Sequence, residues 1–138
     1  MTGTEVEIQA AADAARRARD HAYAPYSDFL MGAAVLTDDG GTIAGVLVEN
    51  VSLGLAMCAE RVALFTAVTQ QRRPIVLALC SKRTAGELTF PCGACLQVAL
   101  EIGGPDLVIV ATDPAGAIDR TTVGELLTRA PKRHSPPH

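Results

Sequence analysis

The sequence has no tryptophan, only three phenylalanines and two tyrosines, and no excess of basic residues. Its uninterrupted apolar stretches, such as 30–36 and 75–80, fall far short of the roughly 20 residues that cross a bilayer. The formal charge is −3, from 12 basic and 15 acidic residues, and no basic run precedes the C-terminal tail. These absences argue against a membrane or nucleic-acid partner and favour a small-molecule ligand.

The chain has 138 residues, which is a usual size for one domain, and its 49% hydrophobic content predicts a folded core. Residues 1–128 are expected to form a single catalytic domain. Residues 129–138 hold three prolines and little apolar content, so we expect a disordered tail there. Glu5 and Glu7 stand where a secretory signal would carry basic residues, which favours a cytoplasmic protein.

The order of the predicted elements indicates an α/β fold. An Ala-rich helix begins at a Thr4–Glu7 capping box, and a turn at 38–41 joins two antiparallel strands over 29–37 and 42–49. The remaining pattern predicts helices over 58–69 and 92–102, buried strands over 74–80 and 107–111, a short strand from 118 and a last helix from 122. This order predicts a three-layer α-β-α sandwich with a mixed five-stranded sheet.

The four cysteines carry the strongest chemical signal. Cys92 and Cys95 form a Cys-x-x-Cys pair at the start of one predicted helix, and Cys58 begins another. The pair alone suits a redox disulfide, half of a structural zinc site or a buried pair. A third cysteine favours zinc, whereas Cys80 ends an apolar strand and is interpreted as a small core residue. Three protein ligands leave the fourth zinc position open, so the sequence predicts a catalytic Zn²⁺ ion.

Glu60 lies two residues after Cys58, in the first turn of the same predicted helix. There it can take a proton from zinc-activated water and deliver it to a ring nitrogen and a leaving amine, or it can simply stabilise the helix N-terminus. Zinc with three thiolates carries a net charge of −1, which two helix N-termini and Arg61 would offset. Gln97 is expected to orient Arg61. The alternative interpretation of Arg61 is that it is only an exposed charge on the helix surface.

Two segments, 58–61 (Cys-Ala-Glu-Arg) and 91–95 (Pro-Cys-Gly-Ala-Cys), together resemble the small zinc-dependent cytidine deaminases. The similarity extends from 23–29 (Tyr-Ala-Pro-Tyr-Ser-Asp-Phe) through 48–52 to 125–127. The resemblance implies a cytidine-deaminase-like fold and the hydrolytic deamination of cytidine or deoxycytidine to uridine or deoxyuridine plus ammonia. It also implies a cytoplasmic enzyme of pyrimidine salvage and a homo-oligomer, a homotetramer, whose sites neighbouring subunits complete.

The resemblance also implies a role for each matching residue. Glu60 would be the catalytic proton shuttle. Phe29 would pack against the pyrimidine, Glu49 would bind a ribose hydroxyl, and the backbone of Ala59 would contact the base. The zinc ligands would be Cys58, Cys92 and Cys95.

The chain departs from the family pattern on the substrate and subunit surfaces. Leu47, Leu53 and Leu96 stand where the family usually has Asn, Tyr and Arg, and no phenylalanine follows Leu127. A modified cytosine nucleoside, such as an antibiotic of the blasticidin S type, is therefore the alternative substrate. From other functional classes, a non-catalytic zinc-stapled binding module and a thiol-redox enzyme are the competing interpretations.

Overall fold

The computed structural model describes residues 3–132, and its elements follow the predicted order. Most boundaries fall within a few residues of the expected ones. The elements are α1 (Glu5–Arg19), β1 (Gly32–Thr37), β2 (Thr42–Val46), the 3-10 turn η1 (Leu53–Leu55), α2 (Ala59–Thr69), β3 (Pro74–Cys80), α3 (Gly93–Gly103), β4 (Val108–Thr112), β5 (Ile118–Thr122) and α4 (Val123–Leu126).

The five strands form one mixed sheet in the order β2-β1-β3-β4-β5. β3 and β4 run parallel, and the other neighbouring strands pair antiparallel. β3, in the centre, is almost entirely buried, which explains its unbroken apolar sequence, since a strand covered on both faces has no solvent side. The predicted mixed five-stranded sheet is confirmed.

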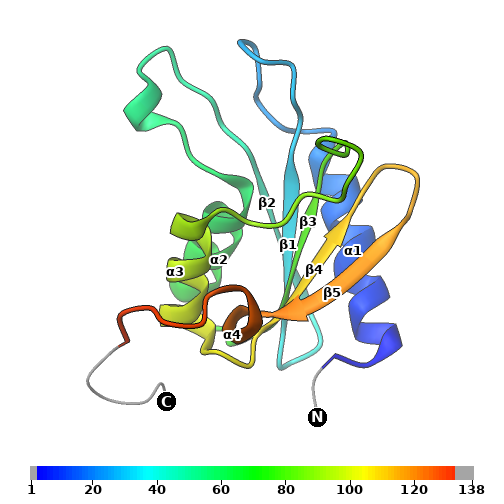
Figure 1. Ribbon diagram of the computed structural model, residues 1–138, viewed down its shortest axis with the longest axis vertical. Helices are drawn as coiled ribbons and strands as arrows, with labels where there is room; N and C mark the ends of the chain where they lie inside the picture. Colours follow the sequence, from blue (N-terminus) through cyan, green and yellow to red (C-terminus); the bar gives the residue numbers. More distant parts are fainter. Residues whose placement is uncertain (1–2, 133–138) are drawn as a thin grey trace.

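Helices cover both faces of this sheet (Figure 1). The alanines of α1 pack closely against buried side chains of β1, β3 and β4 on one face. α2 and α3 lie on the other face and enclose the second core cluster with Leu64, Leu77 and Ile109. The molecule therefore has the predicted three layers, with α1 on one side and α2 and α3 on the other.

One end of the sheet gathers the loops that matter for function (Figure 1). The start of β1 pairs with the end of β3 there, through Gly32 and Cys80. The loops 20–31 and 47–58 lie side by side at this end, joined by hydrogen bonds such as Tyr23 N–H to the Leu47 carbonyl (2.8 Å). The loop after β3 leads from the same end directly into α3.

The C-terminal segment continues past α4 along the α2–α3 side of the sheet. Leu127 and Ala130 pack against the core cluster on that side. Residues 133–138 of the expected tail lie outside the described residues. Within residues 3–132, no helix is both long and apolar enough to cross a membrane.

Gly45 of β2 sets how closely α2 approaches the sheet. A Cβ at this position would lie 2.5 Å from the Ala59 carbonyl oxygen and 2.5 Å from the Ala63 nitrogen. Both are backbone atoms, so α2 itself would have to move. We expect Gly45→Ala to lower the free energy of unfolding by about 1–3 kcal/mol or more, measured by urea denaturation.

Gly54→Ala is the matched control for this substitution, because a Cβ at Gly54 meets nothing within 4 Å. Gly54→Ala should leave the unfolding midpoint nearly unchanged. Equal midpoints for the Gly45 and Gly54 variants would contradict the close packing of α2 on β2.

Candidate metal centre and active site

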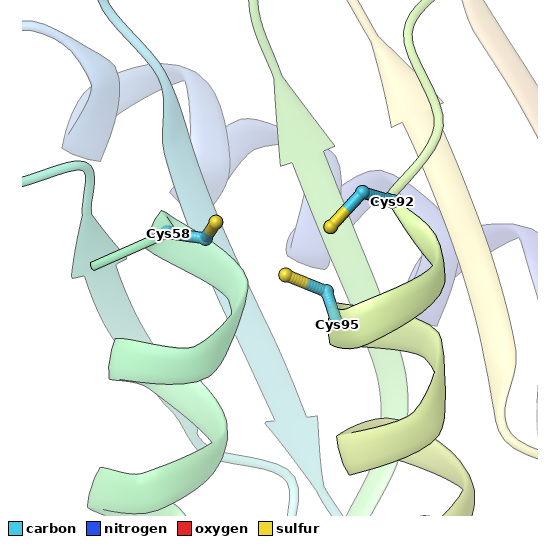
Figure 2. Close-up of side chains that lie close together, drawn as sticks. All are labelled: Cys58, Cys92 and Cys95. Atoms are coloured by element: carbon cyan, nitrogen blue, oxygen red, sulfur yellow. The ribbon is translucent and has the colours of Figure 1, made fainter. Parts of the chain in front are cut away.

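Two helix N-termini bring three cysteines together. Cys58 is the N-cap of α2, Cys92 is the N-cap of α3, and Cys95 lies in the first turn of α3. Their Sγ atoms all lie within 4.8 Å of one another, and the side chains point into the space between the two helices (Figure 2). This cluster is the predicted one, and thiolates at such spacing are a fitting donor set for zinc.

The three thiols differ in their surroundings. Cys95 is buried, Cys58 is half-buried and Cys92 is exposed. Although burial opposes it, hydrogen bonds from the backbone of Cys95 and Ala94 at the start of α3 lower the pKa of Cys92. A helix N-terminus thus favours the thiolate form that a metal requires.

Cys80 takes no part in the cluster. Its side chain is fully buried in the core on the α1 face of the sheet, and burial raises the pKa of its thiol. Its interpretation as a small core residue is confirmed. The cluster therefore offers three cysteine ligands, which leaves a fourth position for a non-protein ligand, as in catalytic rather than structural zinc sites.

Arg61 supplies positive charge beside the cluster. Its Nη2 donates a hydrogen bond to Cys58 Sγ over 3.3 Å. Hydrogen bonds to Cys58 and then to Cys95 raise the pKa of the guanidinium above its already high ordinary value. Arg61 thus offsets part of the negative charge that three thiolates would bring, as the sequence led us to expect.

Glu60 is a buried carboxylate whose Oε1 atom has no hydrogen-bond partner in the described structure. Its residue is 3% exposed, and it lies in the first turn of α2 beside the cysteines. Burial is the largest influence and raises the pKa of Glu60, while Arg61 and Cys95 oppose the change. A buried carboxylate oxygen without a hydrogen-bond partner is costly, so its position beside the cysteines indicates a functional role.

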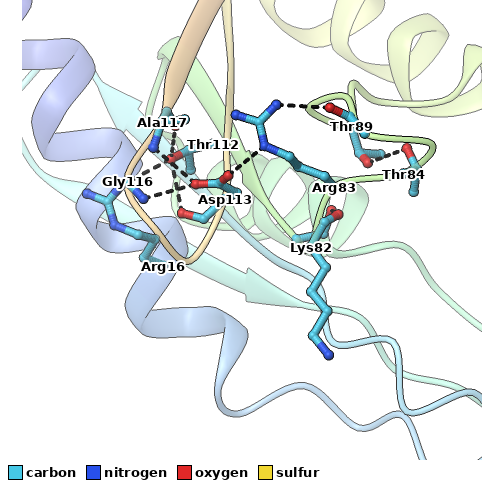
Figure 3. A network of polar contacts seen from close by, with 11 residues as sticks. Arg16, Lys82, Arg83, Thr84, Thr89, Thr112, Asp113, Gly116 and Ala117 are labelled. Carbon is cyan, nitrogen blue, oxygen red and sulfur yellow. Dashed lines mark hydrogen bonds and ion pairs between the residues drawn. The ribbon is translucent and has the colours of Figure 1, made fainter.

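Asp113 shows what a compensated buried carboxylate looks like in the same protein (Figure 3). It is 6% exposed, yet Arg83 Nε donates to its Oδ2 over 3.0 Å, and the N–H groups of Gly116 and Ala117 donate to its Oδ1. Although burial opposes the change, these hydrogen bonds lower the pKa of Asp113. Asp113 therefore links two loops through its hydrogen bonds, whereas Oε1 of Glu60 has no hydrogen-bond partner among the described residues.

The proposed substrate-side residues occupy the neighbouring loops. Ala59, which belongs to α2 rather than to a loop, is buried and directly follows the metal-ligand candidate Cys58. Phe29 is half-buried and lies three residues before β1. Leu47 uses its backbone to join these loops, since its N–H donates to the Met31 carbonyl over 3.0 Å.

Glu49 is engaged by the chain itself. Its Oε1 accepts hydrogen bonds from the backbone N–H groups of Tyr26 (2.9 Å) and Ser27 (3.2 Å), and its Oε2 accepts from the Ser27 hydroxyl. The Ser27 and Tyr26 hydrogen bonds lower the pKa of Glu49, so the carboxylate is ionised at neutral pH. The sequence pattern around 23–29 marked this segment but did not reveal its contact with Glu49.

Gln97 has a partner other than the expected one. Its Nε2 donates to the Pro131 carbonyl over 3.0 Å, which fixes the C-terminal segment on α3. Arg61 Nε, by contrast, is buried and has no partner within residues 3–132. In this structure Gln97 therefore anchors the C-terminal segment, and Arg61 is oriented through its sulfur contacts.

The fold and the site together define a class. A three-layer α/β/α protein has three cysteine ligands for zinc beside a buried carboxylate, which is the arrangement of a metal-dependent hydrolytic enzyme. The family model for the cytidine and deoxycytidylate deaminase zinc-binding region matches residues 6–111. The chain belongs to this zinc-dependent deaminase family.

Individual relatives agree with the family model. The chain is similar to a cytidine deaminase of Halalkalibacterium halodurans, 44% identical over 114 residues that cover 83% of this chain and 86% of the relative. A cytidine deaminase of Mycobacterium tuberculosis is 46% identical over 95 residues, covering 69% and 71% of the two chains. The crystal structure of a cytidine deaminase from Burkholderia pseudomallei superposes with a TM-score of 0.82 at 44% identity, covering 93% of this chain and 99% of that one.

Proposed function

We propose that this protein hydrolyses cytidine or deoxycytidine to uridine or deoxyuridine and ammonia, with Glu60 as the catalytic residue. The observation that carries the proposal is the buried Glu60 carboxylate, whose Oε1 has no hydrogen-bond partner in the part of the chain that the structure describes, beside the Cys58, Cys92 and Cys95 cluster. The relatives named above, which are cytidine deaminases, support the choice of substrate class.

The cysteines would hold the metal, and Glu60 would move the protons. A zinc ion bound by the three thiolates supplies Lewis acidity, which lowers the pKa of a water molecule enough for attack at neutral pH. Glu60 would accept a proton from the attacking water and transfer it to N3 of the ring. It would then accept the remaining proton from the new C4 hydroxyl and pass it to the departing amino group, which leaves a C4 carbonyl. Water adds at C4, the C4–N4 bond breaks, and ammonia leaves.

The environment of Glu60 suits this proton traffic. Burial raises the pKa of the carboxyl above its ordinary value, which makes Glu60 a better proton acceptor for the attacking water. Arg61 stays charged next to Cys58 and limits the negative charge at the cluster. Ala59 would offer its backbone to the base, Phe29 its ring, and Glu49 a carboxylate to the ribose.

The substrate is tested by comparing kcat/KM for cytidine, deoxycytidine and blasticidin S on the zinc-loaded protein. We expect one of the two unmodified nucleosides to have the highest value. Leu47 in place of the usual asparagine favours the alternative of a modified cytosine nucleoside, and a blasticidin S value well above both others would establish it. A zinc-loaded chain that turns over none of the three would instead agree with a non-catalytic binding module.

We also propose that the chain forms a homo-oligomer, a tetramer. Exposed apolar side chains support this: Leu53 is 86% exposed and Leu55 is 70% exposed on η1, while Phe65 and Val68 stand out on α2. Large exposed apolar side chains of this kind are typical of surfaces that another protein surface covers. The proposed cytoplasmic location and role in pyrimidine salvage agree with cysteines that are not joined in disulfides, since thiols persist in a reducing compartment.

The tetramer predicts a molar mass four times the chain mass of 14.4 kDa in size-exclusion chromatography with light scattering. The double substitution Leu53→Asp with Leu55→Asp should shift the mass to a smaller species, because charges would be buried in the contact. Val6→Asp is the control, since Val6 is 80% exposed on α1. A parent protein that elutes at 14.4 kDa would refute the oligomer.

A further inference from the structure

Residues 23–29 reach the site without forming a helix or strand of their own, so individual hydrogen bonds must hold them. At one end, Tyr23 N–H donates to the Leu47 carbonyl and the Tyr23 carbonyl accepts from Glu49 N–H, each over 2.8 Å. At the other end lies Phe29, whose ring the proposed function places against the pyrimidine. What fixes the segment near Phe29 therefore matters for substrate binding.

The Ser27 hydroxyl connects Glu49 to Phe29. It donates to Glu49 Oε2 and accepts from the Phe29 backbone N–H over 3.0 Å. A hydroxyl has one donor and can accept at the same time, so both hydrogen bonds form in one arrangement. The link to an ionised carboxylate is the stronger of the two types, since charge-assisted hydrogen bonds exceed neutral ones.

The backbone between Ser27 and Phe29 makes this link necessary. Asp28 has a φ of +57°, a left-handed conformation that few residues other than glycine adopt. Its N–H donates to the Ala24 carbonyl over 2.9 Å. The chain therefore reverses direction just before Phe29, and the Ser27 hydroxyl is the recorded acceptor for the Phe29 N–H after this turn.

The same unit is tied to the cysteine cluster. Val48, next to Glu49, exchanges two backbone hydrogen bonds with Met57, over 3.0 and 2.9 Å. Met57 precedes Cys58, the N-cap of α2. Hydrogen bonds and the covalent backbone between neighbouring residues thus connect the start of α2 through 48–49 to Ser27 and Phe29.

We propose that Ser27 is a positioning residue, whose hydroxyl, held by Glu49, fixes Phe29 for binding of the pyrimidine nucleoside. This inference rests on the proposed function and deepens it. Glu49 then contributes to substrate binding partly by holding Phe29 in place, because both of its oxygens accept hydrogen bonds from the 26–27 segment. Ser27 does not touch the reacting atoms, so its loss should weaken substrate binding and leave the chemical step intact.

The test is steady-state kinetics of the zinc-loaded Ser27→Ala protein with cytidine. We expect KM to rise about tenfold, the size expected for losing a hydrogen bond to a charged group at an exposed position, with kcat within about twofold of the parent. Ser27→Thr keeps the hydroxyl and should restore KM to within about threefold. Thr42→Val, which removes an exposed hydroxyl at the opposite end of the β1–β2 hairpin, is the control and should change neither constant.

Equilibrium binding of uridine, measured by calorimetry on the same zinc-loaded proteins, gives a second measurement that does not depend on turnover. A parent protein that turns over neither cytidine nor deoxycytidine contradicts the proposed function, and uridine affinity then still tests Ser27. A KM and a uridine affinity for Ser27→Ala within twofold of the parent would overturn the positioning role. So would a loss confined to kcat, or a failure of Ser27→Thr to restore KM.

Discussion

Replacing Glu60 with glutamine should lower the turnover of cytidine by about 10²–10⁴-fold, the usual contribution of a general acid–base group. Glutamine has nearly the same shape but accepts no proton, so the proton-transfer step that the carboxylate serves is lost. Zinc content should stay at the parent level, because Glu60 is not one of the clustered cysteines. Stability should not fall, since the substitution removes a buried carboxyl group whose Oε1 has no hydrogen-bond partner within the described part of the chain.

The matched control is Glu87→Gln, the same substitution at an exposed glutamate in the loop between β3 and α3. It should leave both turnover and zinc content unchanged. Near-normal turnover in Glu60→Gln would show that another group moves the protons. A parallel loss of zinc and turnover would instead place Glu60 among the metal ligands.

Replacing Cys95 with alanine should abolish zinc binding at the site and, with it, turnover. Cys95 is the fully buried member of the cluster, and its thiol is 0% exposed. Removal of a ligand should weaken zinc affinity by more than about 100-fold, which is the upper range for losing only an outer-shell partner. Metal analysis after dialysis against a weak chelator, together with a cytidine assay, measures both effects.

Cys80→Ala separates ligation from packing in this experiment. Cys80 is also 0% exposed, but it lies in the core on the opposite face of the sheet. Each substitution removes one buried sulfur atom, so the two variants should lose similar amounts of stability from packing. Full zinc content in Cys80→Ala beside none in Cys95→Ala supports the cluster, and equal zinc content in the two variants contradicts it.

The fold was largely predictable because its signals are local. The Thr4–Glu7 capping box forms as expected, with Glu7 N–H donating to Thr4 Oγ1 and Thr4 N–H donating to Glu7 Oε1. The unbroken apolar run of residues 74–80 became the central strand without change. Expected strands over 29–37 and 42–49 are shorter in the structure, since Phe29 and Glu49 leave the sheet to bind neighbouring loops.

The metal cluster was predictable for a different reason. Cys58 and Cys92 cap two helices, and short motifs at helix starts fix where a side chain lies relative to its own helix. The partners of Glu49 and Gln97 were not predictable in this way. Glu49 binds residues 22 and 23 positions earlier, and Gln97 binds a carbonyl 34 positions later, so these contacts depend on how the loops meet in space.

The most direct test of the central claim measures the products that the zinc-loaded parent protein forms from cytidine. The account predicts that uridine and ammonia form in equal amounts, that both stop when a chelator removes the zinc, and that both return when zinc is restored. Deamination that continues at the same rate without metal would contradict it. So would a folded protein with one zinc per chain that forms neither product from cytidine or deoxycytidine.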